Sequence, residues 1–158
     1  MIFISTSADA TKAFAREVLT QIKPDTKQAT VLALSGDLGA GKTAFTQGLA
    51  TALGIKSGLT SPTFVLSKKY KIAPAKAVQT GFKQLVHFDF YRLRDIHDLG
   101  VLGWSDLLTE PRNLIVVEWP EQVGGKLAKK TKQINFTHLE LDERKIEATW
   151  LKKISNTN

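Results

Sequence analysis

The sequence predicts one α/β domain with a mostly parallel central sheet flanked by helices and with antiparallel edge strands. Short apolar runs typical of buried strands alternate with segments whose apolar residues recur at helical spacing. A glycine-rich turn joins the first of these runs to a helix, and two segments of alternating polarity come late in the chain. The length of 158 residues suits a single domain over 1–153, with a frayed tail over 154–158.

The first half of the chain predicts two helices around one strand. Residues 7–22 are expected to be helical because apolar residues recur at every fourth position from Phe14 to Ile22. The apolar run 30–34 is expected to be a buried strand, and a second helix is expected over 42–53 after the glycine-rich turn.

The second half of the chain predicts most of the sheet. The expected elements are a strand over 69–72, a loop over 73–81, a strand over 85–89, a helix over 95–108, a strand over 114–118, and alternating strands over 134–136 and 146–150 with a turn at 142–143. Strands that alternate with helices favour parallel pairing, and the late pair favours antiparallel pairing at one edge.

The composition excludes several classes of function. The sequence has no cysteine, which excludes a disulfide scaffold, a thiolate zinc site, an iron–sulfur cluster and a cysteine nucleophile. No stretch approaches the roughly 18 apolar residues that a membrane span needs, and the run after Met1 lacks the basic flank of a signal peptide. We therefore expect a cytoplasmic protein that makes no membrane contact.

The positive charge of the chain is concentrated in one interval. The sequence has 22 basic and 15 acidic residues, a net charge of +7, and no acidic residue lies between Asp37 and Asp89. The lysines of this interval equal the whole net excess: Lys42, Lys56, Lys68, Lys69, Lys71, Lys76 and Lys83. The interval fits a surface that meets polyphosphate or nucleic acid, and it fits a solvated basic face equally well.

The segment Gly36-Asp37-Leu38-Gly39-Ala40-Gly41-Lys42-Thr43 has the pattern of a phosphate-binding loop between a strand and a helix. Its glycines allow the backbone to wrap a phosphate, and the helix N-terminus adds N–H donors. Lys42 would bring a charge to the β- and γ-phosphates, and the Thr43 hydroxyl is a hard oxygen ligand for Mg²⁺. The fold class is therefore expected to be P-loop NTPase-like.

Two carboxylates follow strand-like runs, at the strand ends where open sheets bind ligands. Asp89 follows the run 85–88, and Glu118 follows the run 114–117. A phosphate-loop site needs a carboxylate near its magnesium ion, and either residue could supply it. Either could instead be a helix cap or part of a surface ion pair. The residues alone leave open which of the two binds the metal directly.

Four further side chains bear on this site. Ser61 and Thr63 flank a proline, in a loop whose hydroxyls could sense the γ-phosphate and order with ATP bound, or in an ordinary proline turn. His87 could act as a base, although a histidine inside an apolar run is more often part of the core. Trp119, beside Glu118, could pack against a ligand or report on its binding.

Four segments, in the same order, resemble the TsaE family, the bacterial ATPase needed for the threonylcarbamoyladenosine modification of transfer RNA. The segments are the phosphate loop, Ser61-Pro62-Thr63, His87-Phe88-Asp89-Phe90-Tyr91-Arg92-Leu93 and Val117-Glu118-Trp119-Pro120-Glu121. The last two are much more specific than the phosphate loop. The resemblance extends from about Thr11 to Glu121, with a weaker match to the end of the chain.

This resemblance implies a small phosphate-loop fold, ATP and Mg²⁺ as ligands, and weak ATPase activity. It also implies that the chain works with the TsaB–TsaD pair, which would bring it to transfer RNA. Matching motif positions imply that Thr43 and Glu118 are Mg²⁺ ligands, that Asp89 acts in catalysis or in a water-mediated metal contact, and that Lys42 has a catalytic role. They also imply that the nucleotide phosphates contact Leu38, Gly39, Ala40, Gly41, Lys42 and Thr43. Thr11 and Glu121 are implied to border the adenosine.

Two other functions remain open from the sequence. A small P-loop nucleoside or nucleotide kinase usually carries an arginine-rich lid, whereas Arg92 and Arg94 are the only close arginine pair here. A nucleotide-dependent binding module with negligible turnover is the second, and the presence of both Asp89 and Glu118 argues mildly against it. The turnover rate, the oligomeric state, the adenine pocket and direct contact with transfer RNA are not decided by the sequence.

Overall fold

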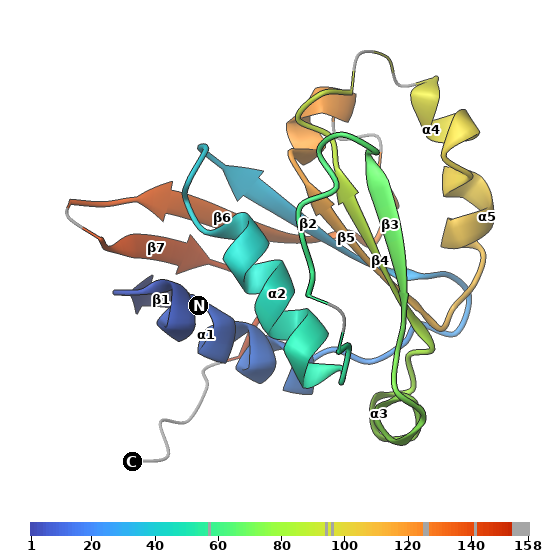
Figure 1. Ribbon diagram of the computed structural model, residues 1–158, viewed down its shortest axis with the longest axis horizontal. Helices are drawn as coiled ribbons and strands as arrows, with labels where there is room; N and C mark the ends of the chain where they lie inside the picture. The colour runs from blue at the N-terminus through green and yellow to red at the C-terminus, as the bar shows by residue number, and fades with distance from the viewer. Residues whose placement is uncertain (57, 94, 96, 125–126, 141, 153–158) are drawn as a thin grey trace.

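The protein is described by a computed structural model over residues 1–56, 58–93, 95, 97–124, 127–140 and 142–152 (Figure 1). The expected tail 154–158 and Arg94 lie outside these residues. In chain order the elements are β1 (Ile2–Ser5), α1 (Ala8–Thr20), β2 (Thr30–Gly36), α2 (Lys42–Ala52), β3 (Ser67–Lys71), α3 (Pro74–Thr80), β4 (Gln84–Asp89), α4 (Asp98–Val101), α5 (Trp104–Leu108), β5 (Asn113–Glu118), the 3₁₀ helix η1 (Pro120–Val123), β6 (Lys132–His138) and β7 (Arg144–Glu147).

All the strands belong to one sheet, in the order β1-β7-β6-β2-β5-β4-β3. The four central strands β6, β2, β5 and β4 are parallel to one another. The outer pairings, β1 with β7, β6 with β7 and β3 with β4, are antiparallel. The predicted α/β class is confirmed, and the antiparallel strands lie at both edges of the sheet.

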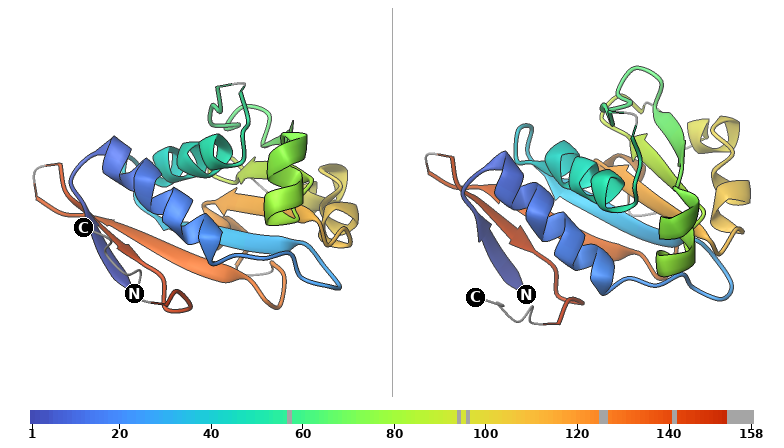
Figure 2. Two further views of the ribbon diagram at one scale, coloured as in Figure 1. Left: turned by 90° about the horizontal axis from the view of Figure 1, so that it is seen from below. Right: turned by 60° about the horizontal axis from the view of Figure 1, so that its bottom comes forward.

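Helices cover both faces of the parallel strands (Figure 1, Figure 2). On one face α1 and α2 pack side by side, and their buried Phe14, Phe45 and Leu49 meet alternate residues of the strands. On the other face α4 and α5 cover β4 and β5, with Trp104 of α5 edge-on to Phe88 at 5.2 Å between ring centroids. Because side chains alternate along a strand, β2, β5 and β4 contribute to both apolar layers, whereas β6 contributes only to the layer under α1 and α2.

Two expectations from the sequence were wrong. The expected loop 73–81 contains helix α3, which begins at Pro74 and ends at Thr80, and the next residue, Gly81, has a left-handed conformation. Because no residue of α3 is buried, the segment lacks the apolar residues at helical spacing that would have predicted a helix. The expected helix 95–108 is two short helices, separated where Gly103 takes a φ of 69°. The N-terminal run, for which no element was expected, is an edge strand, β1, paired with β7.

Element ends differ from expectation by a few residues, as capping explains for α1. The Ser7 hydroxyl accepts a hydrogen bond from the Ala10 backbone N–H at 3.0 Å, so the helix begins at Ala8. Among the residues that the structure describes, no helix has the length and apolar character to cross a membrane.

Candidate functional site

The phosphate loop connects β2 to α2 with a backbone that depends on glycine. Gly36 has a φ of 135°, and a Cβ there would stand 2.1 Å from the carbonyl oxygen of Phe136 on neighbouring β6. Gly41, the residue before α2, has a φ of 101°. Both values lie in the left-handed region that favours glycine. The loop therefore brings its N–H groups and the N-terminus of α2 to one place, as a phosphate site requires.

Lys42 begins α2 and turns back onto the loop. Its side chain is buried, and Nζ donates hydrogen bonds to the carbonyl oxygens of Gly36 at 2.5 Å and Asp37 at 2.8 Å. The ammonium group also lies 3.9 Å from the centroid of the Trp119 ring. Burial lowers the pKa of Lys42, and nearby carboxylates oppose that shift, Glu118 most strongly. The buried ammonium group of Lys42 is therefore a cation that lies beside the phosphate loop.

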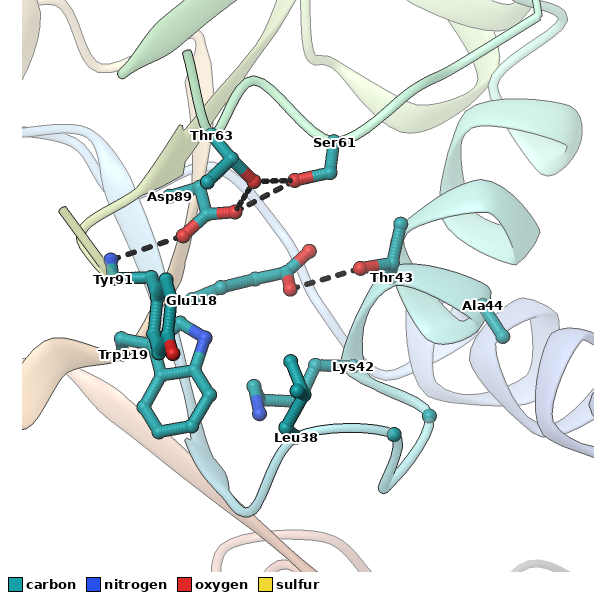
Figure 3. Close-up of a pocket in the computed structure, with 12 residues that line it drawn as sticks. Leu38, Lys42, Thr43, Ala44, Ser61, Thr63, Asp89, Tyr91, Glu118 and Trp119 are labelled. Atoms are coloured by element: carbon teal, nitrogen blue, oxygen red, sulfur yellow. Dashed lines mark hydrogen bonds between the residues drawn. The ribbon is translucent and has the colours of Figure 1, made fainter.

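Glu118 ends β5 and meets the first turn of α2. The Thr43 hydroxyl donates to Glu118 Oε2 at 3.0 Å (Figure 3). The other carboxylate oxygen, Oε1, lies 2.8 Å from Nε2 of His87 on β4. Glu118 is buried, and each of its oxygens has a protein partner. The two residues whose positions imply a metal site are thus in direct contact.

Asp89 ends β4 and anchors the Ser61–Thr63 loop. Its Oδ2 accepts hydrogen bonds from the Ser61 hydroxyl at 2.6 Å and the Thr63 hydroxyl at 2.5 Å (Figure 3). Its Oδ1 accepts one from the Tyr91 backbone N–H at 3.0 Å. Asp89 is opposite Glu118 in the parallel pairing of β4 with β5, so both carboxylates point to the face that α2 covers. The loop hydroxyls therefore belong to the same site.

A pocket of about 360 Å³ lies among these side chains. The predicted site residues that line it are Leu38, Gly39, Gly41, Lys42, Thr43, Ser61, Thr63, Asp89 and Glu118.

Three predicted residues do not line this pocket. Ala40 is fully buried in the core beneath the loop. Thr11 is also fully buried, 2.7 Å from the Ser5 hydroxyl, and a Cβ built on Gly41 would stand 3.8 Å from its side chain. Glu121 is exposed on η1. The structure thus places Thr11 behind the loop and Glu121 outside the pocket.

Two aromatic residues complete the wall of the pocket. Tyr91 and Trp119 pack together with 5.0 Å between ring centroids, and both line it (Figure 3). Trp119 has a φ of 60°, uncommon for a bulky residue, and so faces Lys42 instead of continuing β5. From the sequence alone, a ligand contact was expected of Trp119, whereas no role was expected of Tyr91. The position of Tyr91, two residues after the strand-ending carboxylate Asp89, was the one feature of the sequence that could have indicated a role in the site.

The donor set of the site fits Mg²⁺. Within the described parts of the chain, no group of three or more His, Asp or Glu residues is arranged to hold a metal ion. Thr43 and Glu118 instead offer a hydroxyl and a carboxylate, which are hard oxygen donors. Mg²⁺ typically takes one or two protein ligands and completes its shell with water and substrate phosphates. A phosphate loop beside such a pair suits that arrangement.

The sheet order and the loop define a small α/β protein with a P-loop NTPase-like fold. The crystal structure of Bacillus subtilis YdiB is similar, with a TM-score of 0.68 and 29% sequence identity, and the match covers 94% of this chain and 83% of that one. The family model described as "Threonylcarbamoyl adenosine biosynthesis protein TsaE" matches residues 5–146.

Two relatives carry the name "tRNA threonylcarbamoyladenosine biosynthesis protein TsaE". The Haemophilus influenzae protein is 35% identical over 126 residues, which is 80% of this chain and 73% of that protein. The Bacillus subtilis protein is 37% identical over 142 residues, which is 89% of this chain and 80% of that protein. The chain therefore belongs to the TsaE family, and the resemblance stated from its motifs is confirmed.

Proposed function

We propose that this protein binds and hydrolyses Mg-ATP in the biosynthesis of threonylcarbamoyladenosine on transfer RNA, working with the TsaB–TsaD pair. Family membership supports the pathway. One observation carries the nucleotide part of the proposal: the Thr43 hydroxyl at the end of the phosphate loop contacts the strand-end carboxylate Glu118 at 3.0 Å. That pairing is what a phosphate-loop protein needs to hold a phosphate-bound metal ion.

Each side chain of the site has a role in this proposal. Lys42 leaves the carbonyls of its own loop and turns its ammonium group toward the β- and γ-phosphates. Thr43 and Glu118 hold Mg²⁺, which when bound neutralises charge on the phosphate oxygens. Asp89 orients the attacking water, and the hydroxyls of Ser61 and Thr63 keep its carboxylate in place.

Phosphate release measured with and without the TsaB–TsaD pair tests this function. We expect slow Mg²⁺-dependent release by the chain alone and faster release with the pair. Transfer of the phosphate to a nucleoside would instead identify a kinase. Mg-ATP binding without turnover under either condition would identify a binding module.

Trp119 is expected to report nucleotide binding through its fluorescence. The ammonium group of Lys42 lies against its ring, so a lysine that turns toward phosphates changes the surroundings of the indole. Trp104 is buried in the opposite layer and should not respond. Titration with Mg-ATP should change the emission of the unaltered protein and leave a Trp119→Phe variant unchanged. An equal response from both proteins would contradict this assignment.

The lysines of β3 are expected to affect partner binding and not ATP affinity. Lys69 and Lys71 are exposed on the edge strand, whereas Lys68 donates a hydrogen bond to the Thr60 hydroxyl at 2.8 Å. Replacing Lys69 and Lys71 by glutamine should weaken binding to the TsaB–TsaD pair several-fold and flatten its salt dependence. Binding titrations at two salt concentrations measure both effects. Unchanged binding would mean that these lysines only keep the sheet edge solvated.

A further inference from the structure

We propose that His87 is a positioning residue that orients the carboxylate of Glu118 for Mg²⁺. The inference rests on the proposed function, because it assigns a metal to Glu118. It concerns a residue that the roles above leave unused.

The contact between His87 and Glu118 joins two adjacent parallel strands. His87 is opposite Val116 in the pairing of β4 with β5, and Glu118 lies two residues beyond Val116 on the same face of the sheet. Nε2 of His87 lies 2.8 Å from Oε1 of Glu118. Because an ionised carboxylate only accepts hydrogen bonds, the proton of this bond belongs to Nε2. The histidine therefore donates to Glu118.

The surroundings of His87 give no other reason for a histidine at this position. The side chain is fully buried, and its neighbours on the same sheet face are the apolar Leu85 and Val116 together with Asp89 and Lys68, which hydrogen-bond to other residues. Its second ring nitrogen, Nδ1, is buried without a hydrogen-bond partner among the described residues. A buried, unpaired polar atom is unfavourable, and an apolar side chain would avoid it. The bond to Glu118 is the one polar interaction that accounts for the residue.

This bond divides the two oxygens of Glu118 between two partners. His87 holds Oε1, and Oε2 is left toward Thr43, where the metal site is proposed. Without the donor, the carboxylate could rotate, and its buried charge would lose a hydrogen bond. Partners that orient metal ligands typically affect metal affinity by about 10–100-fold when removed. The expected consequence is weaker Mg²⁺ binding with little change in contacts to the nucleotide.

The test compares His87→Leu, which removes the donor, with His87→Gln, whose side-chain amide reaches the position of Nε2. Leu85→Ala is the matched control, since it creates a defect on the same strand and face without touching Glu118. A fluorescent ATP analogue is titrated at increasing Mg²⁺ concentrations, and also without Mg²⁺. Thermal unfolding of each variant is measured in parallel.

We expect His87→Leu to raise the Mg²⁺ concentration at half-maximal enhancement by about 10-fold or more. Metal-free nucleotide affinity should stay near that of the unaltered protein, and His87→Gln should recover most of the Mg²⁺ response. An unchanged Mg²⁺ midpoint in His87→Leu, an equal shift in Leu85→Ala, or failure of both His87 variants to fold would overturn the positioning role. Absence of Mg²⁺-dependent binding by the unaltered protein would instead overturn the proposed function, and this inference with it.

Discussion

Replacing Lys42 by alanine is expected to abolish productive ATP binding while the fold survives. The substitution removes the one cation that lies within the phosphate loop, where Nζ is bound to two loop carbonyls and covered by Trp119. Loss of one preorganised donor that stabilises charge in a transition state typically costs about 10²–10³-fold in rate. We therefore expect ATP hydrolysis to fall by at least about 10²-fold.

The stability of the Lys42→Ala variant should change little. The substitution removes two hydrogen bonds, but it also removes a charge that burial disfavours in the folded state, where burial lowers the pKa of Lys42. The free energy of unfolding should remain within about 1–2 kcal/mol of the unaltered protein. Lys56→Ala, an exposed lysine of the same basic interval, is the matched control and should keep full activity. Unchanged hydrolysis in Lys42→Ala would refute the nucleotide site.

Removing the charge of either strand-end carboxylate is expected to stop hydrolysis, but in two different ways. Glu118→Gln should lose the Mg²⁺ dependence of nucleotide affinity, because Glu118 is the carboxylate in contact with Thr43. Asp89→Asn should keep that dependence and lose turnover, because Asp89 contacts the Ser61 and Thr63 hydroxyls instead. Each change should reduce the rate by about 10²-fold or more, where 10² is the lower end of the range for general acid–base groups.

Nucleotide titrations with and without Mg²⁺, together with phosphate release, separate the two roles. Glu17→Gln, a neutralised and exposed carboxylate on α1, controls for the change in net charge. If Asp89→Asn instead loses the Mg²⁺ dependence, the assignment of the metal ligand is reversed. If both variants bind and hydrolyse Mg-ATP normally, the two carboxylates have only structural roles.

The parts of the site that the sequence could predict are those encoded within a few consecutive residues. The phosphate loop needs glycines where the backbone is left-handed or meets β6 closely, and these positions stand at fixed spacing before Lys42 and Thr43. Asp89 and Glu118 could be predicted because each ends an apolar run, and parallel strands end at the same edge of the sheet. Helix α3 could not be predicted from local patterns because it buries no apolar face. Only Pro74 at its start and Gly81 after its end mark it in the sequence.

Local sequence therefore specifies the α/β class, the phosphate loop and two carboxylates at the ligand-binding edge. The partners of these groups follow only from the folded structure: Glu118 contacts Thr43 and His87, Asp89 contacts the Ser61–Thr63 loop, and Lys42 contacts its own loop carbonyls and Trp119. These contacts could not be predicted because they join residues from different strands and loops. Their distances depend on strand order, register and side-chain alternation, which are set by packing across the whole sheet.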